Sequence, residues 1–415
     1  MRGVGRVVAL RCISCRTSYE PGTVLYTCPT CGPRRGTLEV LYDYDALAAE
    51  FTRERLARVK ERSMWRYLPL LPVTEERYIQ PLRVGWTPIV PAPSLAEELG
   101  LAALLIKDDG RNPTASYKDR ASAVVVISAQ ERGFETVTCA STGNAASSLA
   151  GFAAATELAT VIFVPERAPE AKVAQLLIFG ARVFVVRGSY DVAYDLAAEA
   201  ADTFGWYNRS AAVHPYLVEG KKTGALELAE QLDWDVPDTV LVSVGDGSVI
   251  SGICKGFDEM LRLGWIDRVP RVVGVQAEGA AAVATAFARC QGADVPIDDG
   301  PADTVADSIC VGAPRDVVKA VTYVRRNGGR FVTVSDREIL DAIATLARRV
   351  GVFAEPAGAA AYAGAAKLAR RGELAGQRVA VMVTGNGLKD IQGARKAAGD
   401  PIVIDPRLDA VKEHL

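Results

Sequence analysis

The sequence predicts an α/β fold made of two interleaved domains, each built on a parallel sheet, with a small cysteine-bearing segment at the N-terminus. Two observations predict it. Short strand-like runs that are β-branched and almost wholly apolar alternate with helical patterns, and two Cys-x-x-Cys pairs lie near the start. Strands that are apolar on both faces are typical of parallel sheets covered by helices on both sides. The chain of 415 residues is long enough for two or three such units.

The composition is that of an ordinary globular protein and argues against several kinds of partner. Hydrophobic residues make up 49% of the chain, charged residues 24%, and the formal net charge is −2. This near-neutral balance gives no electrostatic basis for binding nucleic acid or a membrane surface. No apolar run approaches the roughly 20 residues of a membrane-spanning helix. The first residues do not follow the pattern of a secretory signal and the cysteines are few, so we expect a cytoplasmic protein.

Four cysteines predict a zinc-ribbon-like segment, which we place at residues 1–45. Cys12 and Cys15 form one Cys-x-x-Cys pair, and Cys28 and Cys31 form the other after a gap of twelve residues. Four thiolates would hold zinc in a closed tetrahedral site, so the metal would be structural. Two alternatives stay open: a module that folds onto the body without metal, and a nucleic-acid-binding ribbon. The second has weak support, because the segment carries six arginines against four acidic residues.

The order of strand-like and helical runs predicts the domain organisation. The apolar runs expected to be strands are residues 135–140, 159–164, 181–186, 239–244, 271–278, 330–336 and 378–385. Each is short and β-branched, and most are followed by a helical pattern, as in units with right-handed crossovers. We place a small α/β domain at 135–210 and a large one at 46–134 and 211–415.

Turns at the carboxyl ends of these strands are the candidate ligand sites, because helices begin there. The turn Ser141–Asn144 offers backbone N–H groups, two hydroxyls and an amide to a carboxylate or phenolate oxygen, but the same residues also suit a plain helix cap. The turn Gly245–Ser248 suits a small phosphate at a helix N-terminus. It does not follow the dinucleotide pattern G-x-G-x-x-G, and Asp246 would have to point away from a phosphate. A third turn supplies the hydroxyl of Thr384.

A lysine, a phosphate turn and scattered hydroxyls together indicate pyridoxal phosphate chemistry. This cofactor requires a lysine amine, a phosphate anchor and partners for its ring nitrogen and ring oxygen. Lys118 is the candidate amine, although it could also be an exposed lysine in the first turn of a helix. The chain has only two histidines, so a multi-histidine metal centre is unavailable. A Ser-His-Asp hydrolase would depend on His214 and lacks the G-x-S-x-G elbow.

The chain resembles the threonine synthase family, within the fold type II pyridoxal phosphate enzymes. The motifs that carry the resemblance are NPTASYKDR at 112–120, STGNAASSLAGFAA at 141–154, EGKKT at 219–223, FAEPAGAAA at 353–361 and TGNGLKD at 384–390. They occur in the family's order and extend over most of the chain. The resemblance implies a lyase of amino-acid biosynthesis that takes a small amino acid as substrate and forms a homodimer.

The resemblance also implies roles for individual residues. Lys118 would form the Schiff base with the cofactor and move the proton on the substrate Cα. Asn144 would bind the ring oxygen of the cofactor and Thr384 would face the ring nitrogen. The residues implied to hold the cofactor phosphate are Gly245, Asp246, Gly247 and Ser248, and those implied to bind the substrate carboxylate are Ser141 and Thr142. Lys222 is a further candidate for binding substrate. Glu355 either lines the active site or only favours a helix N-terminus.

One departure from the family bears on the substrate. Leu217, in HPYLVEG, stands where many members have an arginine that binds the substrate phosphate, and a leucine cannot replace a guanidinium. Arg209, Lys221 or Lys222 could compensate.

The activity implied is conversion of O-phosphohomoserine to threonine and phosphate, by γ-elimination and addition of water at Cβ. Two alternatives stay open. One is elimination or replacement on another activated amino acid such as O-phosphoserine, including dehydration of threonine or serine. The other is a catalytically silent protein that binds amino acids or nucleic acid.

Overall fold

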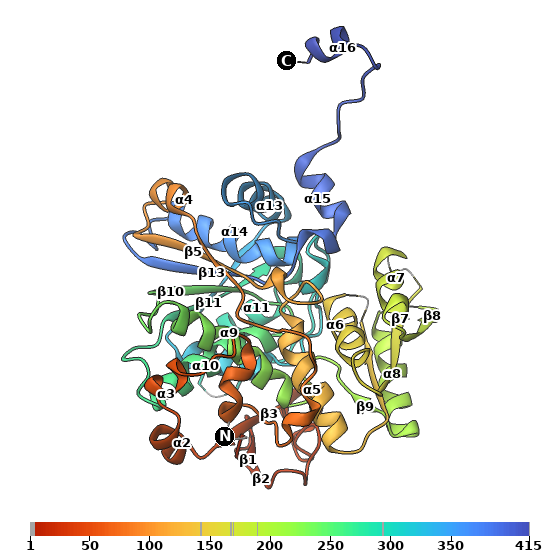
Figure 1. The fold of residues 1–415 in the computed structure, drawn as a ribbon, viewed down its shortest axis with the longest axis vertical. Coiled ribbons are helices and arrows are strands. Elements are labelled where there is room, and N and C mark those ends of the chain that lie inside the picture. The colour runs from red at the N-terminus through yellow and green to blue at the C-terminus, as the bar shows by residue number, and fades with distance from the viewer. Residues whose placement is uncertain are drawn as a thin grey trace.

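The computed structural model describes residues 5–141, 143–166, 168, 170–188, 190–292 and 294–414, and Figure 1 shows how their elements are arranged. The N-terminal segment forms an antiparallel sheet in the order β2-β1-β3. Its strands are β1 (Val7–Cys12), β2 (Ser18–Tyr19) and β3 (Leu38–Tyr42).

The large sheet has six strands in the order β12-β11-β10-β13-β5-β4. Its strands are β4 (Ile89–Pro91), β5 (Ala103–Asp108), β10 (Thr239–Ser243), β11 (Arg271–Ala277), β12 (Arg330–Val334) and β13 (Arg378–Val383). All neighbours are parallel except β4, which is antiparallel to β5. Every residue of the central strand β10 is buried, which is why its sequence reads as an unbroken apolar run.

The small sheet has four parallel strands in the order β8-β7-β6-β9. They are β6 (Thr136–Ala140), β7 (Ala159–Pro165), β8 (Arg182–Val186) and β9 (Tyr207–Asn208). All four strands come from within the predicted small domain 135–210, while the exact domain boundaries stay a prediction.

Helices cover both faces of the large sheet. The longer helices of the whole chain are α5 (Lys118–Glu131), α6 (Asn144–Ala153), α7 (Glu170–Ile178), α8 (Tyr190–Phe204), α9 (Tyr216–Gln231), α10 (Ser248–Arg262), α11 (Ala282–Arg289), α12 (Val317–Arg326), α13 (Asp336–Val350), α14 (Pro356–Arg370) and α15 (Ile391–Ala398). Of these, α6, α7 and α8 pack on the small sheet. The core on one face includes residues of α9, α10 and α12, and the core on the other includes residues of α13 and α14. Helix α5 packs against α9 and α6, so it lies where the two sheets meet.

Short helices complete the chain. The α-helical ones are α1 (Gly32–Arg35), α2 (Tyr44–Glu50), α3 (Arg53–Ala57), α4 (Pro93–Glu98) and α16 (Leu408–Lys412), and the 3₁₀ ones are η1 (Met64–Leu70), η2 (Glu76–Tyr78), η3 (Asp109–Arg111), η4 (Glu278–Ala280), η5 (Asp307–Ile309) and η6 (Gly387–Lys389). Within the part of the chain described, no helix is long and apolar enough to cross a membrane.

The predicted α/β class with parallel sheets is confirmed, and all seven predicted strands form within two residues of their expected ends. The sequence did not reveal β5, the antiparallel strand β4 or the two-residue strand β9.

The N-terminal sheet is attached to the large domain by buried polar contacts. Lys319 Nζ donates to the Leu38 carbonyl at 2.9 Å, and Lys255 Nζ donates to the Val40 carbonyl at 2.7 Å. The Tyr323 hydroxyl donates to Glu39 Oε2 at 2.9 Å. Buried polar groups need such partners, so β3 is fixed against α10 and α12.

Candidate cofactor and substrate site

Lys118 is the first residue of α5 and lies beside the end of β13. The Tyr117 N–H donates to the Thr384 carbonyl at 2.9 Å, and Ser116 forms an isolated bridge with Gly385. Two motifs separated by more than 250 residues of sequence are thereby joined. Thr384 itself is buried, at the turn where the sequence predicted a ligand-facing hydroxyl.

Burial lowers the pKa of Lys118, and the nearby Arg209 guanidinium lowers it further. Asp246 and Glu355 act in the opposite direction, because each carboxylate favours the charged amine. An amine that loses its proton more easily than an exposed lysine suits covalent attachment to an aldehyde. Lys118 is only partly exposed to solvent, so its interpretation as an exposed surface lysine is wrong.

The turn that ends β10 has the geometry of an anion site. Gly247 adopts a left-handed conformation with φ of 98°, and α10 begins at Ser248. A Cβ on Gly247 would lie 2.7 Å from the Cβ of Ala320, and one on Gly245 would lie 3.1 Å from the Cα of Ile309. Both positions therefore favour glycine. The first N–H groups of a helix have no partner within the helix, so the start of α10 is suited to binding an anion.

A second lysine reaches this turn. Lys221 Nζ donates to Ser248 Oγ at 2.6 Å. Burial lowers the pKa of Lys221 well below its usual value, and the charges of Lys118 and Arg209 lower it further. Three basic side chains, Lys118, Lys221 and Arg209, therefore lie close to this turn, and a bound anion there would favour their charged forms.

Asp246, whose carboxylate would repel a phosphate in this turn, accepts hydrogen bonds from a neighbouring loop. Its Oδ1 accepts from the backbone N–H of Arg315 at 3.2 Å, and its carbonyl accepts from the N–H of Asp316 at 3.1 Å. Burial raises the pKa of Asp246. The neutral form is thereby favoured, which reduces repulsion of a phosphate in the same turn.

Asn144 lies at the start of α6 and bonds to a glutamate from a distant part of the chain. Its Nδ2 donates to Glu355 Oε1 at 2.7 Å and to Ser308 Oγ at 3.4 Å. Burial raises the pKa of Glu355, and a Cβ on Gly385 would lie only 2.2 Å from its Oε1. Glu355 is also the N-cap residue of α14, so it stands at a helix N-terminus and contacts the predicted site residue Asn144 as well.

The structure says less about the other residues predicted to bind substrate. Ser141 Oγ accepts from the N–H of Gly143 at 3.1 Å, so this hydroxyl shapes its own turn. Thr142 lies outside the described residues. Leu217 is fully buried in an apolar core that includes Leu149 and Phe152. Its side chain therefore does not bind phosphate.

The structure corrects the expectation that Lys222 contacts the substrate. Lys222 Nζ lies 2.7 Å from Glu219 Oε2 and 2.6 Å from Glu259 Oε2, in a fully buried ion-pair cluster. It also lies 4.3 Å from the ring centre of Tyr42. Its neighbour Lys221 faces the site instead. The available signal was Glu219, three residues before Lys222, which is the spacing of an ion pair along a helix.

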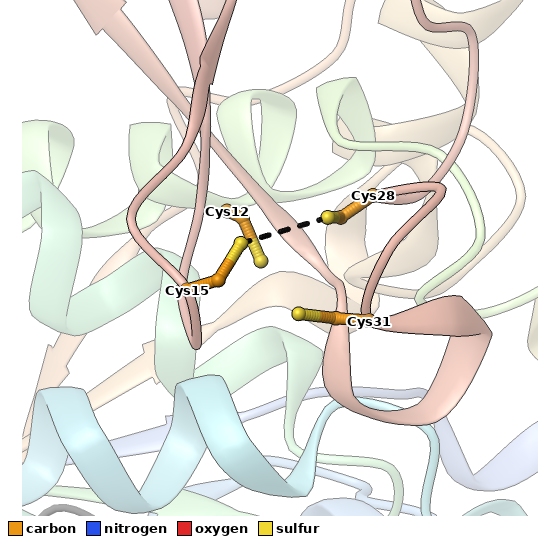
Figure 2. A group of neighbouring side chains, drawn as sticks. All are labelled: Cys12, Cys15, Cys28 and Cys31. Carbon is orange, nitrogen blue, oxygen red and sulfur yellow. Dashed lines mark hydrogen bonds between the residues drawn. The ribbon is translucent and has the colours of Figure 1, made fainter.

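The four N-terminal cysteines point toward one another (Figure 2). Their sulfur atoms all lie within 4.8 Å of one another, and the Sγ atoms of Cys15 and Cys28 are 3.7 Å apart. In a tetrahedral site with Zn–S bonds of about 2.3 Å, neighbouring sulfurs would be about 3.8 Å apart. Hydrogen bonds with Thr17 lower the pKa of Cys15 to about 6, which favours the thiolate that binds metal.

The residues present fit pyridoxal phosphate. An amine with a lowered pKa, a glycine turn at a helix N-terminus and an amide lie around one place, as attachment, phosphate and ring contacts of this cofactor require. The Ser116 hydroxyl, two residues before Lys118, is buried without a hydrogen-bond partner among the described residues.

Comparison with known proteins agrees with this chemistry. The family model of pyridoxal-phosphate dependent enzymes matches residues 81–385. The chain is 39% identical to threonine synthase of Methanocaldococcus jannaschii over 407 residues, which cover 98% of each chain. It is 38% identical to threonine synthase of Methanosarcina acetivorans over 408 residues, again 98% of each chain.

A solved structure agrees in fold. The processed form of threonine deaminase isoform 2 from Solanum lycopersicum superposes with a TM-score of 0.65 at 20% identity, over 79% of this chain and 90% of that one. The chain is therefore a pyridoxal-phosphate dependent enzyme of fold type II and belongs to the threonine synthase family.

Proposed function

We propose that the enzyme converts O-phospho-L-homoserine to threonine and inorganic phosphate, as a carbon–oxygen lyase. The observation that carries the proposal is a pair of buried basic side chains near Lys118. They are Lys221, whose Nζ donates to Ser248 Oγ at 2.6 Å, and Arg209, whose Nη2 donates to Ser122 Oγ at 3.1 Å. A phosphorylated amino acid needs such a group in addition to the anchor for the cofactor phosphate. The names of the relatives support the same activity.

Each residue has a distinct task in this proposal. Pyridoxal phosphate, when bound, supplies the electron sink that lets protons leave the substrate carbons. Lys118 holds the cofactor and then moves the proton at the substrate Cα. The Gly245–Ser248 turn would hold the cofactor phosphate, Asn144 would bind the ring oxygen, and Thr384 would be the partner of the ring nitrogen. Ser141 and Thr142 bind the substrate carboxylate.

Arg209 and Lys221 take over the task of the arginine that many family members have at the position of Leu217. Arg209 is nearly fully buried, and its Nη2 lies 3.1 Å from Ser122 Oγ. A buried guanidinium held by a neighbouring hydroxyl is a preorganised partner for the substrate phosphate. Lys221 donates to Ser248 Oγ at 2.6 Å and is close enough to this guanidinium for the two charges to interact, so it can bind the same phosphate.

Replacing Lys221 by methionine tests this role, because methionine keeps most of the length and removes the charge. We expect KM for O-phospho-L-homoserine to rise about 10- to 100-fold in cofactor-loaded enzyme, as loss of a charged hydrogen bond would produce. Phosphate and threonine are assayed together, with Lys60→Met, at an exposed lysine, as the control.

Two outcomes would contradict this account. An unchanged KM together with weaker cofactor binding would assign Lys221 to the cofactor phosphate. The second outcome is an unsubstituted protein that shows bound-cofactor absorbance and still releases no phosphate from O-phospho-L-homoserine. That result would reject the proposed substrate, and O-phosphoserine, threonine and serine would be assayed next.

We also propose that the four N-terminal cysteines bind one structural zinc ion. Native mass spectrometry of the purified protein is expected to show one zinc per chain, and Cys15→Ser is expected to weaken its retention. Cys139→Ser, at a buried cysteine outside the cluster, is the control. Metal-free protein with four freely titratable N-terminal thiols would refute the proposal. The homodimer and the cytoplasmic location stay predictions.

A further inference from the structure

The C-terminal arm, which we define as residues 400–414, stands away from the body of the molecule (Figure 1). It follows α15 and ends in α16. Every residue from 400 to 409 is exposed, although the arm is rich in apolar side chains. The large apolar residues exposed along it are Ile402, Val403, Ile404, Leu408 and Val411, of which Val403 is 90% exposed. Such a concentration of exposed apolar surface marks a contact with a partner.

The edge of the small sheet offers a matching surface. Among the described strands, β8 pairs only with β7, so its other edge presents backbone groups without a neighbouring strand. Phe184 and Val185 of β8 are both exposed, and so are Leu177 and Ile178 of the adjacent helix α7. An edge with this character can accept an added strand from another chain.

The two segments are also complementary in charge and length. The arm reads Asp400-Pro-Ile-Val-Ile-Asp405, and β8 with the next residue reads Arg182-Val-Phe-Val-Val-Arg187. Each has an apolar centre between two charges of one sign, and the signs are opposite. Because the charges are the same at both ends of each segment, either strand direction pairs acid with arginine.

The present contacts of the arm are weak enough to be exchanged. Asp400 lies 2.7 Å from Arg395, and Asp405 lies 3.6 Å from Arg407, with all four side chains exposed. Ion pairs of this kind contribute little to stability. Prolines at 401 and 406 bound the segment, which limits it to a short added strand.

We propose that the arm of one copy adds as a strand to the β8 edge of a second copy of this chain. In Figure 1 the arm extends away from β8 of its own chain, which leaves that edge open to another molecule. Reciprocal exchange would close a two-fold dimer in which both exposed apolar surfaces are covered. This contact between two copies does not depend on which substrate the enzyme takes.

Cysteine cross-linking tests the proposal in the full chain. Two differently tagged chains, one with Val403→Cys and the other with Val185→Cys, are co-expressed and treated with mild oxidant. A covalent dimer that carries both tags is expected. Unsubstituted chains and each single variant alone, treated in the same way, control for the native cysteines.

A double variant with both substitutions on one chain separates the possible partners. A cross-link within a single chain would overturn the proposal by showing that the arm folds back onto its own β8. Absence of any cross-link would overturn it as well. Charge reversal gives an independent check: Asp400→Arg with Asp405→Arg should abolish the covalent dimer, and adding Arg182→Asp with Arg187→Asp should restore it.

Discussion

Alanine in place of Lys118 is expected to give a folded protein without bound-cofactor absorbance and with activity reduced at least about 10³-fold. Alanine is a good helix former, so the first turn of α5 should persist. The substitution also removes an amine whose charge burial and Arg209 disfavour. Only the attachment point of the cofactor and the proton carrier at Cα are lost.

Three measurements check this expectation: the visible absorbance of protein loaded with pyridoxal phosphate, release of phosphate, and far-ultraviolet circular dichroism. Lys60→Ala, which removes an exposed lysine, should leave all three unchanged. An alanine variant at 118 that keeps both absorbance and activity would remove Lys118 from the chemistry.

The largest loss of stability is expected from Arg120→Met. Arg120 is fully buried, with Nε 2.6 Å from Asp109 Oδ2 and Nη1 2.7 Å from Glu227 Oε1. Methionine fills part of the volume of the arginine but removes the cationic partner of the Asp109 and Glu227 carboxylates. Lys107 forms an ion pair with Glu227, at 3.1 Å, and none with Asp109 among the described residues. We expect the free energy of unfolding to fall by about 3–5 kcal/mol, as when a buried ion pair loses one member.

Urea unfolding of the two proteins measures this difference. The control is Arg337→Met, because Arg337 forms an exposed pair with Asp341 at 3.1 Å and should contribute less than about 1 kcal/mol. If Arg120→Met cost no more than this surface control, the buried cluster would not stabilise the fold.

The pH dependence of unfolding gives a second readout of the same cluster. Arg120 and Lys107 outweigh the effect of burial and lower the pKa of Glu227 to about 2. The unfolded chain therefore takes up a proton first, and the stabilisation by Glu227 is lost as the pH falls from about 4.5 toward 2. This loss should be smaller in Arg120→Met, where the pKa of Glu227 is less depressed.

The sequence by itself determined the class of fold and the position of most chemical groups along the chain. Strands such as β10 and β13 are buried on both faces, so their apolar runs are unbroken and were predicted within two residues. The turns that follow such strands contain Gly247, Asn144 and Thr384, whose residue types already indicate a ligand site. The spacing of the four cysteines predicted the cluster that the structure brings together.

Only the tertiary structure decided which of these groups act together. Lys221 and Lys222 are adjacent, and the choice between them depends on Glu259, which α10 brings against α9. The contact between Asn144 and Glu355 joins residues 211 positions apart. Periodicity and spacing record which face of an element is buried, but they do not record which distant element covers it. Contacts made across the fold therefore fixed the charges around Lys118, the burial of Leu217 and the open edge at β8.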